Sequence, residues 1–201
     1  MDKTTKNIIQ VINGKTVKFI SDTHEYYIDD IKVPSVTQIV SKMLPNQYKN
    51  VDPMVLLRAA NKGIALHKEI ELYELNQKIG ITREFKSYLK LKQQYEFEVL
   101  ENEQLIYIEI DGKPVCAGRL DMIIDSKQEE GLGIADIKRT YNIHHDHLKL
   151  QLNLYAIGYE QCYKKEIKYL KCIHLRNYDR HYINVPLDKL QVINIIKTLN
   201  E

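Results

Sequence analysis

The strongest constraint on how this chain can fold is a pair of apolar runs near its middle, joined by a short polar turn. The runs are LDMIID and LGIADIK, and the turn between them is SKQEEG. Apolar runs of this length around a polar turn predict a β-hairpin in the core of a sheet. Strands buried on both faces normally read as continuous Val, Ile and Leu. Here Asp121, Asp136 and Lys138 interrupt them, so the fold has to accommodate three charges inside a core hairpin.

The spacing of these charges indicates one chemistry that would explain them. Side chains alternate across a strand, so Asp136 and Lys138 share a face, and the hairpin can bring Asp121 beside Asp136. Two adjacent carboxylates repel unless a cation intervenes. Mg²⁺ and Mn²⁺ favour oxygen ligands, and a metal can polarise a phosphoryl oxygen and activate a water. The set therefore predicts metal-assisted phosphodiester hydrolysis, and the alternative is an exposed Asp-x-Lys strand pair, as most such pairs are.

The N-terminal half of the chain predicts short strands followed by helices. Residues 8–33 alternate as strands broken by polar turns. Ser35 with Gln38 three residues later forms the signature of a capping box, so a helix is expected from about Val36. A longer helical segment follows over residues 53–77, with Gly63 as a candidate break between two helices.

The C-terminal half predicts a mixed sheet with helices around it. TREFKSYLKLKQQYEFEV indicates a helix that leads into a strand near Phe97, QLIYIEI alternates as a strand, and DGK is a hairpin turn. After the central hairpin, HLKLQLNLYAIGYEQCYK is apolar on almost every side, which predicts a buried helix. Two further strands, IKYLKCIHL and HYINVPL, precede a last amphipathic helix, DKLQVINIIKTLN. This order predicts an α/β domain with a mixed sheet.

Length and composition set broader limits. The chain has 201 residues, which suits one domain, and a net charge of +2, which permits nucleic-acid binding without requiring it. No apolar run approaches the ~18 residues of a membrane span, and MDKTTKNIIQ has no signal-peptide pattern. The three cysteines are odd in number and lack short paired spacing, as expected for reduced thiols in a cytoplasmic protein. We therefore expect a single cytoplasmic domain with no membrane partner.

Two motifs outside the hairpin bear on its interpretation. GIALHKEIELYE places His67 on the apolar stripe of a helix, where a lone histidine is more often a core residue than a ligand. QLNLY places Gln151 and Tyr155 one helical turn apart on the same face, which alone would indicate routine packing. Taken in order with Asp121, Asp136 and Lys138, however, these residues form a recognisable set.

In this set the chain resembles the RecB-like branch of the PD-(D/E)xK nuclease superfamily, in particular phage-encoded exonucleases and mitochondrial genome maintenance exonucleases. HEYYIDDIKVPSVTQIV is similar to the N-terminal segment of that subgroup, and GIALHKEIE looks like its helical histidine motif. AGRLD, ADIKRT and QLNLYA look like the catalytic aspartate, the D-x-K strand and the Q-x-x-x-Y helix. The resemblance implies a restriction-endonuclease-like core with a central mixed sheet flanked by helices, plus an N-terminal β/helical segment. It implies one nuclease domain, 1–201, with the histidine motif in 1–95 and the catalytic core in 96–201.

The resemblance also implies roles for individual residues. The metal, Mg²⁺ or Mn²⁺, would be held by four ligands: His67, Asp121, Asp136 and the carbonyl of Ile137. Lys138 would activate water or stabilise charge, and Gln151 and Tyr155 would support the site or position the phosphate.

Two further residues extend this set. A glutamate often precedes the catalytic aspartate by one strand in this branch; Glu103 is preferred, and Glu109 and Glu98 remain competitors because the register is not fixed. Thr140 stands where the family often has a small hydroxyl that touches a phosphate.

The chain departs from the superfamily pattern at two points. Leu120 replaces the proline of the superfamily's name, which is usual for the branch. Three cysteines without cluster-like spacing predict no iron–sulfur cluster, although some relatives have one.

Basic, aromatic and histidine side chains add weaker indications. The candidates to contact the DNA backbone are Arg58, Lys62, Lys68 and Arg139, and scattered solubilising charge is an equal alternative for each. Tyr73 or Tyr141 could stack on bases, although most of the tyrosines are expected to pack. The histidines of NIHHDHLK could form a second metal site, but a solvated helix entry with Asp146 near the cap is preferred.

The sequence thus leads to a metal-dependent DNA nuclease acting in recombination, repair or processing of phage or bacterial DNA. An exonuclease on single strands or duplex ends is expected. The alternatives are an endonuclease of the same fold and a non-catalytic protein that binds DNA or another partner.

Overall fold

A computed structural model describes residues 7–46 and 48–199. The chain begins with an antiparallel sheet in the order β1-β2-β3-β4, and its strands are β1 Ile8–Ile12, β2 Lys15–Ile20, β3 Glu25–Ile28 and β4 Ile31–Val33. One face of this sheet is buried, because alternate residues of the strands are apolar: Val17, Phe19, Tyr26 and Ile28 are all at most 4% exposed. The predicted short strands in residues 8–33 are therefore confirmed.

Three helices follow, and the first begins where the local sequence predicts. Helix α1, Val36–Met43, begins with the predicted capping box, in which Ser35 and Gln38 exchange side-chain and backbone hydrogen bonds. Helix α3 spans Arg83–Gln94. Between them, α2 runs without interruption from Pro53 to Asn76, so the predicted break at Gly63 is wrong. A single glycine costs a helix only about 1 kcal/mol, which the packing of later residues such as Leu66 and Ile70 can offset.

The rest of the chain forms a five-stranded mixed sheet in the order β5-β6-β7-β8-β9. Only β7 and β8 are parallel; helix α4 connects them, as parallel neighbours require a crossover. The elements are β5 Phe97–Ile110, β6 Lys113–Ser126, β7 Leu132–Lys138, α4 His145–Tyr163, β8 Ile167–Arg176, β9 Asp179–Val185 and α5 Lys189–Leu199. This confirms the predicted mixed α/β architecture, including the central hairpin β6–β7 and the buried α4.

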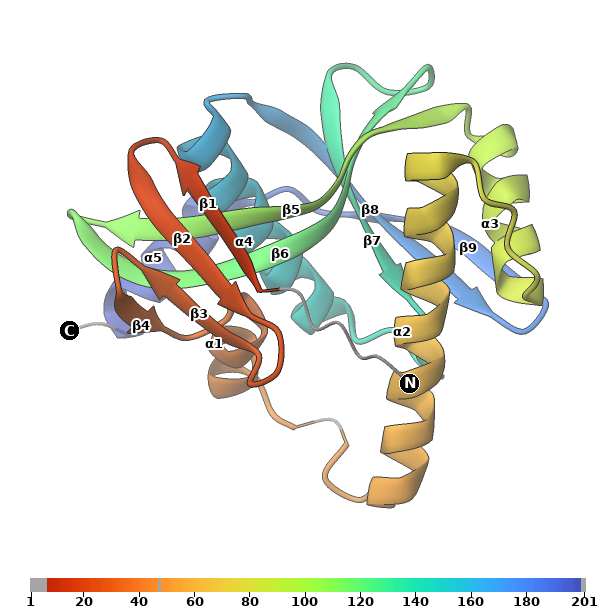
Figure 1. Ribbon diagram of the computed structural model, residues 1–201, viewed down its shortest axis with the longest axis horizontal. Helices are drawn as coiled ribbons and strands as arrows, with labels where there is room; N and C mark the ends of the chain where they lie inside the picture. Colours follow the sequence, from red (N-terminus) through yellow and green to blue (C-terminus); the bar gives the residue numbers. More distant parts are fainter. Residues whose placement is uncertain (1–6, 47, 200–201) are drawn as a thin grey trace.

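The five-stranded sheet is covered on both faces (Figure 1). Helix α4 packs along one face, and the other is covered by α2 and α3 toward one end and by the N-terminal sheet toward the other. Neighbouring residues of β6 therefore enter different cores: Ile123 packs with α4, and Ile124 packs with α2 and α3. Such two-sided burial explains why the hairpin is apolar on both faces.

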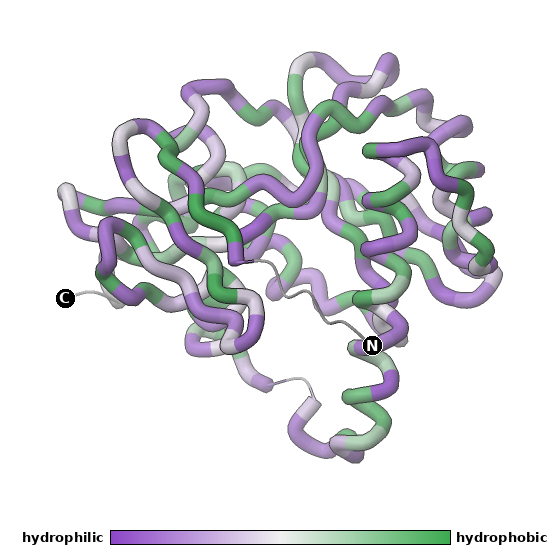
Figure 2. The backbone as a smooth tube through the Cα atoms, in the orientation of Figure 1, coloured by the Kyte–Doolittle hydropathy of each residue, from purple (hydrophilic) through white to green (hydrophobic). Residues whose placement is uncertain are grey.

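The N-terminal half of α2 is not part of either core. It extends away from the rest of the molecule (Figure 1) and carries hydrophobic residues (Figure 2). Met54, Val55, Leu57 and Ile64 are each more than half exposed. Among the described residues, no helix is both long enough and apolar enough to cross a membrane.

Candidate active site

The hairpin brings the two predicted aspartates together. Met122 pairs with Ala135, so Asp121 and Asp136 follow at the next position of the β6–β7 ladder. The Asp121 Oδ2 atom accepts a hydrogen bond from the backbone N–H of Ile137 at 2.7 Å. Asp136 is only 2% exposed. Two carboxylates thus lie side by side in the core, as the alternation of the strands predicts.

Lys138 and helix α4 complete one side of the site. The Lys138 Nζ atom lies 2.7 Å from Asp136 Oδ2 and donates to Gln151 Oε1 at 3.2 Å. The Gln151 amide nitrogen in turn donates to Asp136 Oδ1 at 3.3 Å and to the Tyr155 hydroxyl at 3.4 Å. Gly118 makes room for this arrangement, because a Cβ atom there would lie 2.9 Å from the Tyr155 ring. The predicted D-x-K and Q-x-x-x-Y residues therefore form one hydrogen-bonded group.

Helix α2 supplies His67 from the opposite side. Its Nε2 atom bonds the carbonyl oxygen of Ile137 at 3.0 Å, and its Nδ1 atom lies 3.5 Å from Asp121 Oδ1. Burial lowers the pKa of His67, but the nearby charges of Asp121 and Asp136 outweigh that effect and raise it to about 9. At neutral pH the imidazole is therefore a cation, held between two of the oxygens that the resemblance assigns to a metal.

Among the three glutamates considered for the site, the structure brings Glu103 into it. The pairs Asn102–Met122 and Gln104–Leu120 flank it, which places Glu103 opposite Asp121. Ligand atoms of His67, Glu103 and Asp121 lie within 4.8 Å of one another. Glu109 instead pairs with Lys15, and Glu98 is exposed near the start of β5.

The backbone and charge of Glu103 are both unusual. Its φ of 53° falls in the left-handed region, which interrupts the regular pleat of β5. Burial, and then the negative charge of Asp121, raise the pKa of Glu103 to about 7. Arg119 Nε lies 2.5 Å from Glu103 Oε2 and is a further member of the site that the sequence reasoning missed. The sequence could have indicated Arg119, because it lies in AGRLD two residues before Asp121.

This donor set fits a divalent cation. Asp136 Oδ2 is buried, and its partner among the described residues is the Lys138 ammonium 2.7 Å away. Burial, and the charge of Asp121, raise the pKa of Asp136 even though Lys138 opposes this. Carboxylates with an imidazole and a main-chain carbonyl suit Mg²⁺ or Mn²⁺. The three carboxylates Asp121, Asp136 and Glu103 are matched in number by the cations His67, Lys138 and Arg119, so a divalent cation would bind here by displacing protons such as the one on His67.

The four candidate DNA-contacting cations occupy different settings. Arg58 and Lys62 are exposed on the projecting half of α2. Lys68 is exposed and pairs with Glu71 at 2.9 Å. The Arg139 guanidinium is instead bound to Glu84, with contacts of 2.9 Å and 2.7 Å, and is largely buried. Its setting indicates that it fixes the end of β7 against α3.

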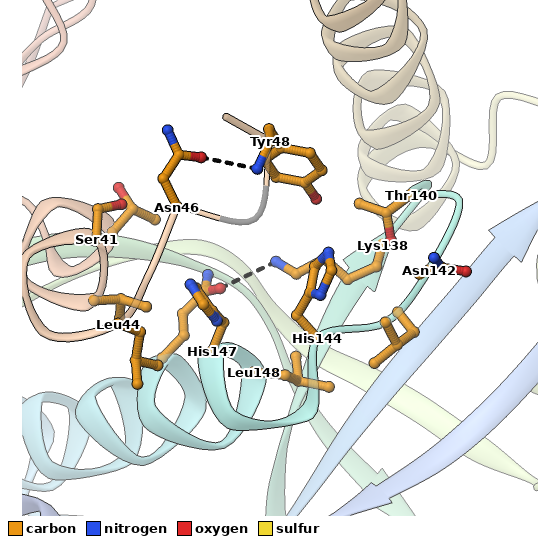
Figure 3. Close-up of a pocket in the computed structure, with 14 residues that line it drawn as sticks. Ser41, Leu44, Asn46, Tyr48, Lys138, Thr140, Asn142, His144, His147 and Leu148 are labelled. Atoms are coloured by element: carbon orange, nitrogen blue, oxygen red, sulfur yellow. Dashed lines mark hydrogen bonds between the residues drawn. The ribbon is translucent and has the colours of Figure 1, made fainter. Parts of the chain in front are cut away.

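A cavity of about 360 Å³ opens beside Lys138 and Gln151 (Figure 3). Thr140 lines it, and the Thr140 Oγ1 atom is buried without a hydrogen-bond partner among the described residues. His144 and His147 line it as well, while His145 is exposed. His144 occupies the N-cap position of α4 and makes no side-chain cap bond. The histidine cluster is therefore partly turned into a cavity rather than wholly solvated.

Comparisons with known proteins leave the family open. No protein-family model matches the chain, and no curated protein matches it. Among solved structures it is similar to the crystal structure of SSO0001, with 18% sequence identity over 82% of this chain and 73% of the other, and a TM-score of 0.44. A likeness at that level carries no functional argument, so the function rests on the site itself.

We expect the affinity for Mn²⁺ to rise with pH between about 7 and about 9. A proton on Glu103 or His67 competes with the metal, and their pKa values are about 7 and about 9. Each proton is displaced more easily as the pH rises, so the affinity increases through this window and then levels off. Titration calorimetry in buffers of different protonation enthalpy measures both affinity and proton release.

The matched variant is His67→Ala, which should weaken Mn²⁺ binding by about 10- to 100-fold and remove the upper part of the pH dependence. An unchanged affinity in this variant would show that His67 is a core residue and not a metal ligand.

Proposed function

We propose that this protein is a Mg²⁺- or Mn²⁺-dependent deoxyribonuclease of the RecB-like branch of the PD-(D/E)xK superfamily. The observation that carries the proposal is the convergence of Asp121, Asp136 and Lys138 with His67 and Gln151 in one connected group. These residues come from four separate elements, β6, β7, α2 and α4. A purely structural role gives no reason to gather two carboxylates, a lysine and a histidine in a core.

The finer fold assignment belongs to the same proposal. The β6–β7 hairpin followed by α4 and the parallel strand β8 is the part that would correspond to a restriction-endonuclease-like core. We place the protein in the cytoplasm of a bacterium or an infected host, with DNA recombination, repair or processing as its setting.

The positions of the site residues suggest a separate role for each in hydrolysis. A bound metal would polarise the phosphate and lower the pKa of a water, with Asp121, Asp136, Glu103 and His67 as its protein ligands. Burial lowers the pKa of Lys138, but the charges of Asp136 and then Asp121 outweigh it and raise that pKa. Lys138 is therefore an ammonium at neutral pH. In that form it donates hydrogen bonds and stabilises charge on the phosphate rather than removing a proton.

Gln151 and Tyr155 hold this arrangement in place. Gln151 contacts both Lys138 and Asp136, so it fixes the distance between them. Burial, and then the charge of Asp136, raise the pKa of the Tyr155 phenol well above its usual value, so it stays protonated while its oxygen accepts from Gln151. These two residues position the catalytic groups.

Linear and covalently closed circular DNA distinguish the modes of cutting. We expect degradation of end-labelled linear DNA in Mn²⁺ while the closed circle stays intact, because an exonuclease requires an end. The Asp136→Asn protein, purified in parallel, controls for contaminating nucleases. Cleavage of the circle would instead support an endonuclease of the same fold. Binding to DNA without cleavage of either form would leave the non-catalytic alternative.

A further inference from the structure

The cavity beside Lys138 has the size and position of a ligand subsite. Its volume of about 360 Å³ lies within the range of small-molecule pockets, about 300–1,000 Å³. Lys138 and Gln151 form the wall that it shares with the proposed catalytic residues, and the remaining walls come from α1, the loop after α1, the loop between β7 and α4, and the start of α4 (Figure 3). Anything bound in it would lie next to a phosphate held by Lys138.

The lining of the cavity suits a flat aromatic ligand with polar edges. Its apolar walls are Val40, Leu44, Ile143 and Leu148. The rings of Tyr48 and His144 stand edge to face, with centroids 5.6 Å apart. Hydroxyl and amide groups of Ser41, Thr140 and Asn142 are placed around this apolar interior. A nucleobase presents an apolar face and hydrogen-bonding edges of this kind.

The charge of the lining further limits the class of ligand that the cavity can bind. Among the described residues that line the cavity, Lys138 carries a fixed charge and none is acidic, although Asp136, just outside the lining, lies 2.7 Å from the Lys138 Nζ atom. The Nδ1 atom of His147 and the Oγ1 atom of Thr140 lie in the wall without hydrogen-bond partners among the described residues. An apolar pocket with one cation at its inner edge favours an anion that carries a ring, and a nucleotide has that composition.

We propose that this pocket takes the unstacked base of the nucleotide adjoining the phosphate held at Lys138. The inference rests on the proposed nuclease function and specifies its substrate. A base that is paired in a duplex stays stacked between its neighbours and cannot enter a pocket of this kind without being extruded. The substrate is therefore a single strand or a frayed end, and the protein takes hold of one base before its phosphodiester is cut.

A fluorescence experiment tests whether a base enters the pocket. The sequence has no tryptophan, so Tyr48→Trp introduces a single tryptophan into the wall, whose emission can be excited selectively over that of tyrosine; the Asp136→Asn background keeps the DNA uncut. We expect single-stranded DNA to quench this emission, and an abasic strand of equal length to bind with much less quenching. Tyr178→Trp is the matched control, because Tyr178 is 69% exposed and lies outside this pocket. Equal quenching by both strands, or quenching by neither, would overturn the proposal.

A second pair of variants tests the pocket in the active protein. Ser41 is exposed on α1 and lines the cavity, whereas its neighbour Lys42 is exposed and does not. Ser41→Trp should fill the pocket and lower kcat/KM on single-stranded DNA by about 5- to 150-fold, the worth of one base-stacking contact. Lys42→Trp should keep the normal value.

The base pocket and the nuclease function can fail separately. A wild-type protein that cuts no DNA would overturn both proposals. Normal cutting by wild type and by Ser41→Trp alike would remove the base pocket and leave the nuclease function standing.

Discussion

Lys138→Ala and Asp136→Asn are each expected to lower the rate of metal-dependent DNA hydrolysis by about 10²- to 10³-fold or more. In the proposed mechanism Lys138 is the cation that stabilises charge on a phosphate, and Asp136 is the buried carboxylate beside it, 2.7 Å away. Removing the ammonium leaves developing negative charge without its donor. Removing the carboxylate charge takes away an expected metal ligand and the partner that holds Lys138 in place. Single-turnover cleavage of end-labelled DNA in saturating Mn²⁺ measures both effects.

The matched control is Lys149→Ala. Lys149 lies in α4 and, like Lys138, forms an ion pair, here with Asp188 at 3.1 Å; its side chain bonds Asp188 and Gln191, and neither is a proposed site residue. This variant should keep normal activity. Thermal melting should show that the site variants remain folded, since Lys138 borders a cavity rather than the apolar core and Asn keeps the volume of Asp136. Normal hydrolysis by either site variant would refute the assignment of the active site.

Gly133→Ala is expected to destabilise the protein by about 1–3 kcal/mol, the cost of overpacking a core. Gly133 lies in β7, and a Cβ atom there would approach the Tyr169 ring to 2.1 Å. The ring cannot easily move, because Tyr169 is 8% exposed and its hydroxyl donates to the carbonyl oxygen of Ile124. For a chain of this length the melting temperature should fall by roughly 2–4 °C for each kcal/mol.

Gly63→Ala provides the same chemical change with the opposite expected sign. Gly63 lies inside α2, where an added Cβ atom would meet nothing within 4 Å. Alanine is the better helix former, so this variant should gain up to about 1 kcal/mol. Urea unfolding of the two variants compares the free energies directly. A Gly133→Ala protein as stable as wild type would show that β7 can shift away from Tyr169.

Much of the fold could be predicted because its signals are local. The capping box of Ser35 and Gln38 fixes the start of α1 within four residues, and the structure confirms it. The wrong prediction at Gly63 arose where a local signal competes with distant packing. The second half of α2 is held by the α3 side of the core, through residues such as Leu66 and Ile70, and this holds the helix together through a glycine that a short peptide would tolerate poorly.

In the candidate site, too, local patterns predicted some residues, and others depended on contacts between distant segments. Alternation along a strand was enough to place Asp136 and Lys138 on one face, and the short turn was enough to place Asp121 beside them. The choice of Glu103 over Glu98 and Glu109 needed the register of β5 against β6, which depends on pairing along the whole hairpin. Arg139 illustrates the same limit, because its partner Glu84 lies 55 positions earlier in the chain.

The sequence by itself determined the order of strands and helices, the acid pair with its lysine, and the spacing of Gln151 and Tyr155. These are properties of neighbouring residues, whose geometry the backbone repeats of strand and helix dictate. Only the tertiary structure decided which glutamate joins the acids, which cations are already paired, and that a cavity opens beside Lys138. Those features arise where α1, α2, α4 and the sheet meet, and contacts between distant segments depend on packing that no local pattern encodes.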